Sequence, residues 1–254
     1  MSDNENSIDL AGAGFKRHQL AGYEKRVVLE AFAGYVIDVI GKINDGKEAT
    51  VYLCQADSSA GVELLAAKMF RAKVFKAFDN DRQYRNLRKF KDRRMAKLMA
   101  GNSARGQRNF HYHWIDTEWR VLCQLYEEGV AVPKPYLHCA DGILMEYFGE
   151  RDRPAPRLID VKLSDQEAGE LFAKILDDVE SMLNCSIVHG DLSAYNLLYR
   201  EGDYRIIDLP QAVDIRTMPD GRALFERDLV NLCKYFKKQG VDPDPALLAQ
   251  RMWY

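Results

Sequence analysis

Cysteine is scarce in this 254-residue sequence, and the few that occur form no paired motif. The five are odd in number and widely spaced, at Cys54, Cys123, Cys139, Cys185 and Cys233. Without a C-x-x-C pair, this spacing argues against a zinc site and against a disulfide framework. A reducing compartment fits this pattern, so we expect a cytoplasmic protein.

Long hydrophobic runs are also missing. No stretch approaches the roughly 18 consecutive apolar residues that a membrane-spanning helix needs. The first ten residues, MSDNENSIDL, are too polar and acidic for a signal peptide. We therefore expect no membrane partner. With 47% hydrophobic and 29% charged residues, the chain has enough apolar material for one large domain or two small lobes.

The net charge of only −2 argues against a uniformly basic nucleic-acid binder, but it hides a local asymmetry. Residues 68–108 contain 14 Lys and Arg against three Asp, a balance of +11, which leaves −13 for the rest of the chain. The segment 71–110, called the basic insert below, also contains a glycine-bounded interruption at 101–106 and is expected to be flexible. It fits a solvated helix and loop, and equally a contact surface at 71–108 for RNA or for a ribosomal or acidic partner.

Hydrophobic patterning divides the chain into a strand-rich half and a helix-rich half. Helical spacing over 23–34 is followed by β-branched and aromatic runs that predict strands at 35–43, 49–56 and 64–70. A helix is expected from a cap at Asp116 to a stop at Gly129, and then a hairpin that turns at Asp141-Gly142. Helices are predicted over 164–184, with a Ser164–Glu167 capping box, and over 222–240, with a hairpin around 201–203 between them. This pattern predicts two lobes with a cleft between them.

The first chemical signal is GKINDGKE, from Gly41 to Glu48. It nearly matches the phosphate loop of P-loop proteins, but Glu48 stands where that loop needs a small hydroxyl residue. A strand rather than a helix is also predicted to follow. A glycine loop between two antiparallel strands instead suits the way kinases cover ATP, although a plain hairpin turn explains it equally well.

A second signal is IVHGDLSAYNLL followed by YRIIDL. Asp191 and Asn196 have the D-x-x-x-x-N spacing of a kinase catalytic loop, and Asp208 follows an apolar strand. One carboxylate can orient an attacking hydroxyl, while an amide oxygen and a second carboxylate are hard ligands that suit magnesium. His189 more reasonably shapes this loop from the core than reacts.

Lys68 is a third signal, because it lies on an apolar strand downstream of the glycine loop. This is the position of a lysine that contacts ATP phosphates, and such a lysine needs a helix carboxylate as partner. Glu118 is the natural choice. Each of these residues alone could be an ordinary surface charge, but their order along the chain argues against that interpretation.

Together these motifs resemble the RIO family of atypical serine/threonine protein kinases over roughly residues 35–250. GKEATVY resembles the family's nucleotide loop, HGDLSAYNLL its catalytic loop, IIDLPQAVD its metal loop, and MEYFGERDRPAPRL its hinge and the segment after it. The basic insert matches the family's flexible loop in position and is most like that of the first RIO subfamily. The resemblance is also compatible with a compact prokaryotic member. The sequence departs from the family at Asn44 and Asp45, where a hydroxyl is usual, and at Pro210.

The resemblance implies an α+β, bilobal protein-kinase-like fold. The boundaries expected are a loosely ordered N-terminus at 1–22, a strand-rich N-lobe at 23–147 that carries the basic insert, and a helical C-lobe at 148–254. It implies ATP and Mg²⁺ or Mn²⁺ as cofactors. The catalytic residues would be Asp191, Lys68 and Glu118, and the metal ligands Asn196 and Asp208. The nucleotide would be bound by Gly41, Gly46, Lys47, Glu48, Val51, Lys68, and the hinge residues Met145, Glu146, Tyr147 and Phe148.

Three functions follow as hypotheses. The leading one is phosphoryl transfer from ATP to Ser/Thr of protein substrates or of the chain itself, with an ATPase cycle as a further activity. A small-molecule kinase of the aminoglycoside or choline kinase type shares H-G-D-x-x-x-x-N, but GKEATVY and DLPQAVD favour the RIO family. A nucleic-acid-binding scaffold with a regulatory ATP site would use the basic insert, although the intact set of Lys68, Asp191, Asn196 and Asp208 argues against degeneracy.

Overall fold

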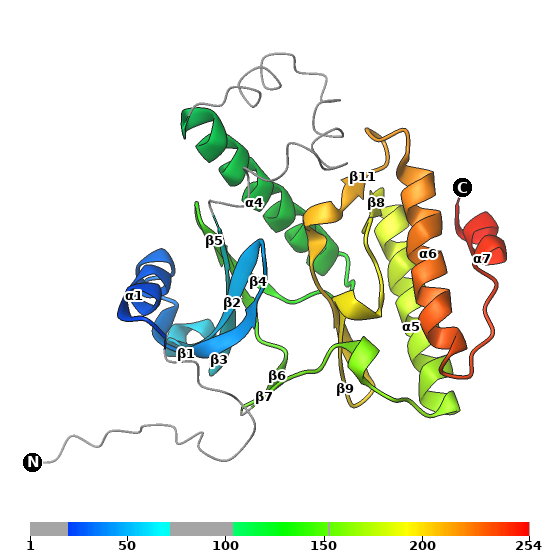
Figure 1. Cartoon of the computed structure of the whole chain (residues 1–254), viewed down its shortest axis with the longest axis horizontal. Coiled ribbons are helices and arrows are strands. Elements are labelled where there is room, and N and C mark those ends of the chain that lie inside the picture. The colour runs from blue at the N-terminus through cyan, green and yellow to red at the C-terminus, as the bar shows by residue number, and fades with distance from the viewer. Residues whose placement is uncertain (1–19, 72–103, 152, 254) are drawn as a thin grey trace, which may run out of the picture.

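The computed structural model describes residues 20–71, 104–151 and 153–253, and its first part is built on a five-stranded antiparallel sheet (Figure 1). The strand order is β1-β2-β3-β5-β4. The elements of this part are α1 (Gly22–Ala31), β1 (Val36–Asp45), β2 (Ala49–Ala56), the short 3-10 turn η1 (Ser58–Ala60), β3 (Leu64–Phe70), α4 (Ala104–Glu127), β4 (Pro135–His138) and β5 (Gly142–Glu146). The three strands predicted at 35–43, 49–56 and 64–70 and the hairpin at Asp141-Gly142 are confirmed.

The two faces of the sheet pack into different cores. On strand β3, Leu65, Ala67 and Met69 lie in one core with α1. Because side chains alternate along a strand, Lys68 and Phe70 point to the opposite face, where Phe70 joins the core that includes residues of α4. Lys68 is therefore carried by a buried strand but faces away from the core beneath α1.

The second part is mainly helical and lies beyond α4 in Figure 1. Its helices are α5 (Asp165–Asn184), α6 (Gly221–Lys237) and α7 (Pro245–Met252). Two-stranded ladders connect them, and two of these, β6–β7 and β8–β11, were not anticipated. The strands and 3-10 turns are β6 (Gly149–Glu150), β7 (Arg153–Pro154), η4 (Leu158–Asp160), β8 (Ile187–Val188), η5 (Ala194–Asn196), β9 (Leu197–Arg200), β10 (Asp203–Ile206), η6 (Leu209–Gln211) and β11 (Val213–Asp214).

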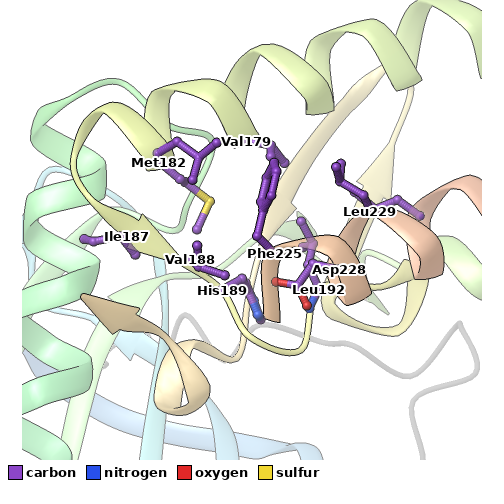
Figure 2. Close-up of a pocket in the computed structure, with 11 residues that line it drawn as sticks. Val179, Met182, Ile187, Val188, His189, Leu192, Phe225, Asp228 and Leu229 are labelled. Carbon is purple, nitrogen blue, oxygen red and sulfur yellow. The ribbon is translucent and has the colours of Figure 1, made fainter. Parts of the chain in front are cut away.

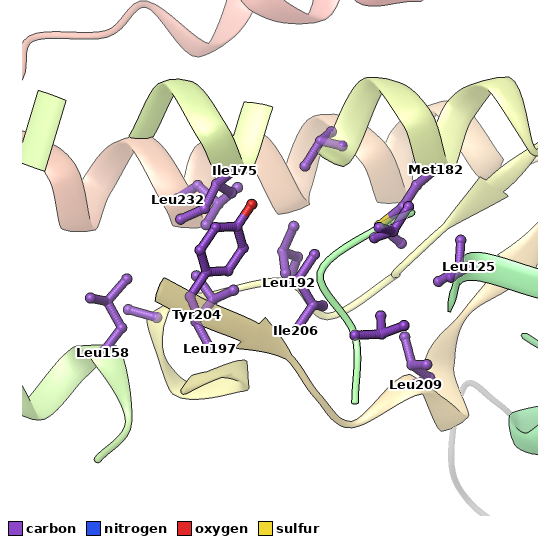
Figure 3. Close-up of a cluster of buried hydrophobic side chains, with 14 of the residues drawn as sticks. Leu125, Leu158, Ile175, Met182, Leu192, Leu197, Tyr204, Ile206, Leu209 and Leu232 are labelled. Atoms are coloured by element: carbon purple, nitrogen blue, oxygen red, sulfur yellow. The ribbon is translucent and has the colours of Figure 1, made fainter. Parts of the chain in front are cut away.

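Helix α5 shows how the sequence builds the helical part. The predicted capping box is present: Glu167 N–H donates to Ser164 Oγ, and the Glu167 carboxylate accepts from the Ser164 backbone N–H. The apolar side chains of one face, Ile175 and Met182 among them, enter the core shown in Figure 3. Each large aliphatic side chain fully buried in this way contributes about 1.5–3 kcal/mol, so this face fixes α5 against β9 and β10.

Two boundaries predicted near the end of the basic insert were wrong: the start of the helix that contains Asp116 and the extent of the flexible interruption. Helix α4 begins at Ala104 and not after Asp116, which lies within the helix and forms an i,i+4 ion pair with Arg120. The expected flexible interruption therefore does not include Gly106, because a single glycine costs only about 1 kcal/mol in a helix that good helix formers surround. Residues 72–103 of the basic insert and residues 1–19 lie outside the described part, while Gly22 of the expected loose N-terminus already begins α1.

Candidate active site

Lys68 is the centre of a buried charge cluster. Its Nζ lies 2.6 Å from Glu118 Oε1 and 3.3 Å from Asp208 Oδ1. Burial alone would lower the pKa of Lys68, but the two carboxylates outweigh that effect and raise the pKa. The lysine is therefore held as a cation where three distant segments of the chain meet.

Glu118 reaches this cluster from α4, the helix that crosses the sheet. The residue is 5% exposed, and its neighbour one turn later, Leu122, is buried in the same core. One carboxylate oxygen accepts from Lys68, while Oε2 is buried and has no hydrogen-bond partner among the described residues. The predicted pairing of Lys68 with Glu118 is thus present in the fold.

Asp208 follows strand β10 in a left-handed backbone conformation, with φ 67° and ψ 62°. Few residues other than glycine adopt this conformation, and it commonly marks functional sites. The turn carries the chain into η6, where Leu209 is buried, and leaves half of the Asp208 side chain exposed. Its carboxylate can therefore bind Lys68 on one side and a ligand on the other.

Asn196 and Asp191 are brought together by the loop that precedes β9. Asn196 Nδ2 donates to the Asp191 carbonyl at 2.8 Å and lies 3.4 Å from Asp191 Oδ2. The Ile207 N–H donates to the Asn196 carbonyl, which places this loop directly beside Asp208. Because the amide nitrogen is engaged, the amide oxygen of Asn196 is the end left for a cation.

A cleft of about 740 Å³ connects these groups with the hinge. Most of the residues predicted for nucleotide binding line it: Gly46, Lys47, Glu48, Val51, Lys68 and Met145 to Phe148, together with Glu118, Asn196 and Asp208. Gly41 does not. It lies within β1 opposite Leu53, because the strand continues to Asp45 and shortens the loop. Asp191 is exposed and lies outside the lining of this cleft, next to Asn196.

The donor set suits a magnesium ion held jointly with a nucleotide. No group of three or more His, Cys, Asp and Glu side chains that could hold a metal alone occurs in the described part of the chain. Asp208 and the amide oxygen of Asn196 supply only two hard ligands. Magnesium prefers six, commonly completed by waters and phosphate oxygens. These two residues thus fit a metal that arrives with a phosphate ligand.

The sequence from the second strand onward matches one family along most of its length. The RIO domain matches residues 50–248. The chain belongs to the RIO family. The α+β, protein-kinase-like fold that the resemblance implied is confirmed with this assignment. The matched range contains Lys68, Glu118, Asp191, Asn196 and Asp208, whereas Gly46 to Glu48 precede it.

Relatives from distant organisms are similar in sequence to this chain. The serine/threonine-protein kinase RIO1 of Caenorhabditis elegans is 28% identical over 87% of this chain and 40% of its own length. The RIO-type serine/threonine-protein kinase Rio1 of Thermoplasma acidophilum is 32% identical over 73% of this chain and 91% of its own. RIO3 of Mus musculus is 29% identical, so the assignment to the first subfamily stays a prediction. The chain spans about two fifths of the length of the animal relatives.

A solved structure with a related architecture is the autoinhibited serine kinase domain of the giant muscle protein titin. It is 11% identical, with a TM-score of 0.49, and covers 72% of this chain and 47% of the titin chain. This overlap is too weak to add to the RIO assignment. No helix in the described residues is long and apolar enough to cross a bilayer.

Sequence reasoning missed Asp228, which holds the loop that contains Asp191 through two backbone hydrogen bonds. This residue of α6 is 3% exposed, and its two carboxylate oxygens accept from Gly190 N–H at 2.7 Å and Leu192 N–H at 3.0 Å. Burial raises the pKa of Asp228 to about 7, although both backbone donors oppose the rise. The sequence does contain a signal for this residue, because Asp228 is an acidic side chain on the same buried face of α6 as Phe225 and Leu229.

His189 lies beside Asp228 in the same compact core, as Figure 2 shows. Burial lowers the pKa of His189, which favours the neutral ring, and its Nε2 lies 3.1 Å from the Ile207 carbonyl. This confirms the expectation that His189 shapes the loop from inside. Gly190 has φ +78°, and a Cβ there would lie 2.6 Å from the Gln211 carbonyl oxygen. The loop from His189 to Asn196 is thus held on both sides by contacts that leave Asp191 exposed.

Proposed function

We propose that this protein transfers the γ-phosphoryl group of ATP to serine or threonine hydroxyls, on protein substrates or on itself. The observation that carries the proposal is the junction at Lys68, whose ammonium is within hydrogen-bond distance of both Glu118 and Asp208 at the wall of a nucleotide-sized cleft. The names of the matched RIO relatives, serine/threonine-protein kinases, support the same activity.

ATP would lie with its adenine at the hinge and its phosphates at Lys68. Met145 to Phe148 would receive the base through backbone hydrogen bonds, with Val51 covering it from β2. The loop at Gly46, Lys47 and Glu48 would cover the phosphates. Lys68, fixed by Glu118, would bind phosphate oxygens, since its charge is retained despite burial.

Asn196 and Asp208 would hold Mg²⁺ or Mn²⁺ against those phosphates. The ion supplies neutralisation of the charge on the phosphate oxygens when it is bound. Asp191 would orient the acceptor hydroxyl and accept its proton. Its exposure beside Asn196 supports this role, because a protein hydroxyl must approach from outside the cleft.

The test is incubation with γ-labelled ATP and Mg²⁺, with the protein alone and with added cell lysate. Label on serine or threonine of the protein or of lysate proteins is the expected result. Label on a small metabolite would support a small-molecule kinase instead. Binding of ATP without any turnover would support a scaffold with a regulatory site. A metal-free control containing EDTA should abolish transfer.

An ATPase cycle through Asp208 is a second activity that the geometry favours. Asp208 is half exposed and is held at the phosphate end of the cleft by Lys68. Its carboxylate oxygen could attack the γ-phosphorus, releasing ADP and forming an acyl phosphate that water then hydrolyses to inorganic phosphate. Label released by hydroxylamine would support this cycle. Label that survives hydroxylamine as phosphoserine would exclude Asp208 as the main acceptor.

The partner surface of the basic insert remains a prediction, since residues 72–103 lie outside the described part. Salt-sensitive binding of RNA or an acidic protein is expected from its charge. Neutralising Arg88, Lys89, Arg93 and Arg94 should remove it. Unchanged binding would leave the insert as a solvated surface. The boundary between an N-lobe at 23–147 and a C-lobe at 148–254 and the cytoplasmic location are likewise predictions.

A further inference from the structure

A bidentate ion pair joins the hinge to strand β10. Arg205 Nη2 and Nε donate to Glu146 Oε1 at 3.0 Å and Oε2 at 3.2 Å. Glu146 also forms a reciprocal pair with Lys134, whose N–H donates to Oε2 at 3.0 Å while its carbonyl accepts from Glu146 N–H at 2.8 Å. The Glu146 side chain and its backbone N–H are therefore both committed to these partners.

The next residues of the hinge are held from the same side. The guanidinium carbon of Arg205 lies 4.6 Å from the centre of the Phe148 ring, and that of Arg200 lies 5.4 Å from it. Arg200 Nη1 donates to the Gly149 carbonyl at 2.7 Å, and Ala155 N–H donates to the Phe148 carbonyl at 3.1 Å. Two arginines of the β9–β10 hairpin thus contact the Phe148 ring, and one of them also binds the backbone directly after it.

Strand β10 connects this clamp with the other end of the cleft. Arg205 is followed by Ile206 and Ile207, which line the cleft, and then by Asp208. Asp203 holds the guanidinium in place from the same strand, with Nη1 3.0 Å from its Oδ1. The four residues from Arg205 to Asp208 therefore include both the side chain that pairs with Glu146 and the one that meets Lys68.

We propose that Arg205 is a positioning residue that fixes the distance between the adenine-binding hinge and Asp208, so that one nucleotide can reach both. The inference rests on the proposed function, because it concerns where ATP binds. An arginine suits this role, since its planar fork matches a carboxylate in one orientation. The side chains of Arg205 and Glu146 are 20% and 27% exposed, so the pair is shielded enough to hold the geometry.

The experiment measures binding of a fluorescent ATP analogue and its displacement by inorganic tripolyphosphate. Arg205→Met, Glu146→Gln and the double variant are compared with the wild-type protein, and melting temperatures are recorded. The matched control is the exposed i,i+4 pair on α6, Arg222 with Glu226, changed to Met and Gln. Tripolyphosphate reports the phosphate end alone, whereas the ATP analogue needs both ends.

Arg205→Met should weaken binding of the ATP analogue about tenfold, because a charge-assisted bidentate contact is lost. Binding of tripolyphosphate should stay unchanged. The double variant removes both charges, so its melting temperature should recover while its affinity for the analogue stays low. The α6 control should change neither affinity.

If the double variant recovered its affinity for the analogue together with its melting temperature, the pair would be merely structural and the inference would be overturned. Tripolyphosphate binding that weakened in Arg205→Met as much as analogue binding would overturn it as well. Unchanged analogue affinity in Arg205→Met, with binding intact in the wild type, would overturn the inference and leave the proposed function standing. A wild-type protein that does not bind the analogue would overturn the proposed function itself.

Discussion

Replacing Asp228 with Asn should make the stability of the protein less sensitive to rising pH and should lower its activity. The carboxylate of Asp228 is buried beneath the loop that contains Asp191, where it accepts from Gly190 N–H and Leu192 N–H. Asn is nearly isosteric but has a single acceptor, so its NH₂ group faces one of the two backbone donors. The loop around Asp191 should then shift, and turnover should fall on the order of tenfold to a hundredfold, as misplacement of catalytic groups generally causes.

The stability effect follows from the raised pKa of Asp228, about 7 against an ordinary value of 3.8. Because the folded state holds this proton more tightly than the unfolded chain, the contribution of the carboxyl to stability is present below pH 4. It is lost as the pH rises towards 7. Between pH 5 and pH 8 this loss is about 3 kcal/mol at 1.36 kcal/mol for each pH unit. Asn does not titrate, so the variant should not show it.

Thermal unfolding at pH 5 and pH 8 measures this difference, together with kinase assays at pH 8. Other groups also titrate, among them His189, whose pKa burial lowers. The difference between variant and wild type isolates Asp228. The melting temperature of the variant minus that of the wild type should be about 6–12 °C higher at pH 8 than at pH 5. The reason is that 1 kcal/mol shifts the melting temperature of a protein of this size by about 2–4 °C. Asp242→Asn, at an exposed carboxylate, is the control. A difference that does not change with pH would refute the reasoning.

Three further substitutions test other parts of the site. Asp191→Asn should retain binding of the ATP analogue and lower turnover about 10²–10⁴-fold in a phosphoryl-transfer assay; turnover within a few-fold of wild type would exclude it as the base. Lys68→Met leaves the buried Glu118 uncompensated, so urea unfolding should show a loss of about 3–5 kcal/mol that Lys68→Met/Glu118→Gln largely restores. Gly190→Ala forces both a positive φ and a close contact. It should therefore lower the melting temperature more than Gly202→Ala, where φ is also positive but where a Cβ would lie more than 4 Å from every described neighbour.

Local signals in the sequence were enough to predict much of the fold. Lys68 could be placed on a strand because the residues on either side of it in LLAAKMF are apolar. The Ser164–Glu167 capping box is a contact over three residues, so the sequence alone specifies it. The D-x-x-x-x-N spacing likewise fixes Asp191 and Asn196 in one loop, and the structure adds only how the amide is oriented.

Interactions between residues far apart in the sequence were not predictable in the same way. The pairs formed by Asp228 with Gly190 and by Arg205 with Glu146 span 38 and 59 residues. Their members lie on different elements whose packing no local pattern records. The start of α4 was misjudged for a related reason. Asp116 has the residue type of a helix cap, but the helix continues through it and the side chain pairs with Arg120 instead.

Buried charges at this site lower the stability of the folded protein, but they also hold neighbouring groups in place. Lys68, Glu118 and Asp228 are each at least nine-tenths buried, and removing such groups from water costs several kcal/mol before any partner compensates. One oxygen of Glu118 has no hydrogen-bond partner in the part of the chain that the structure describes, and Asp228 is protonated more readily than an ordinary carboxyl. An apolar core would be more stable at these positions. It could neither hold a cation beside Asp208 nor accept the two backbone hydrogen bonds that shape the loop at Asp191. The charges least favourable to folding are therefore the ones that the proposed chemistry requires.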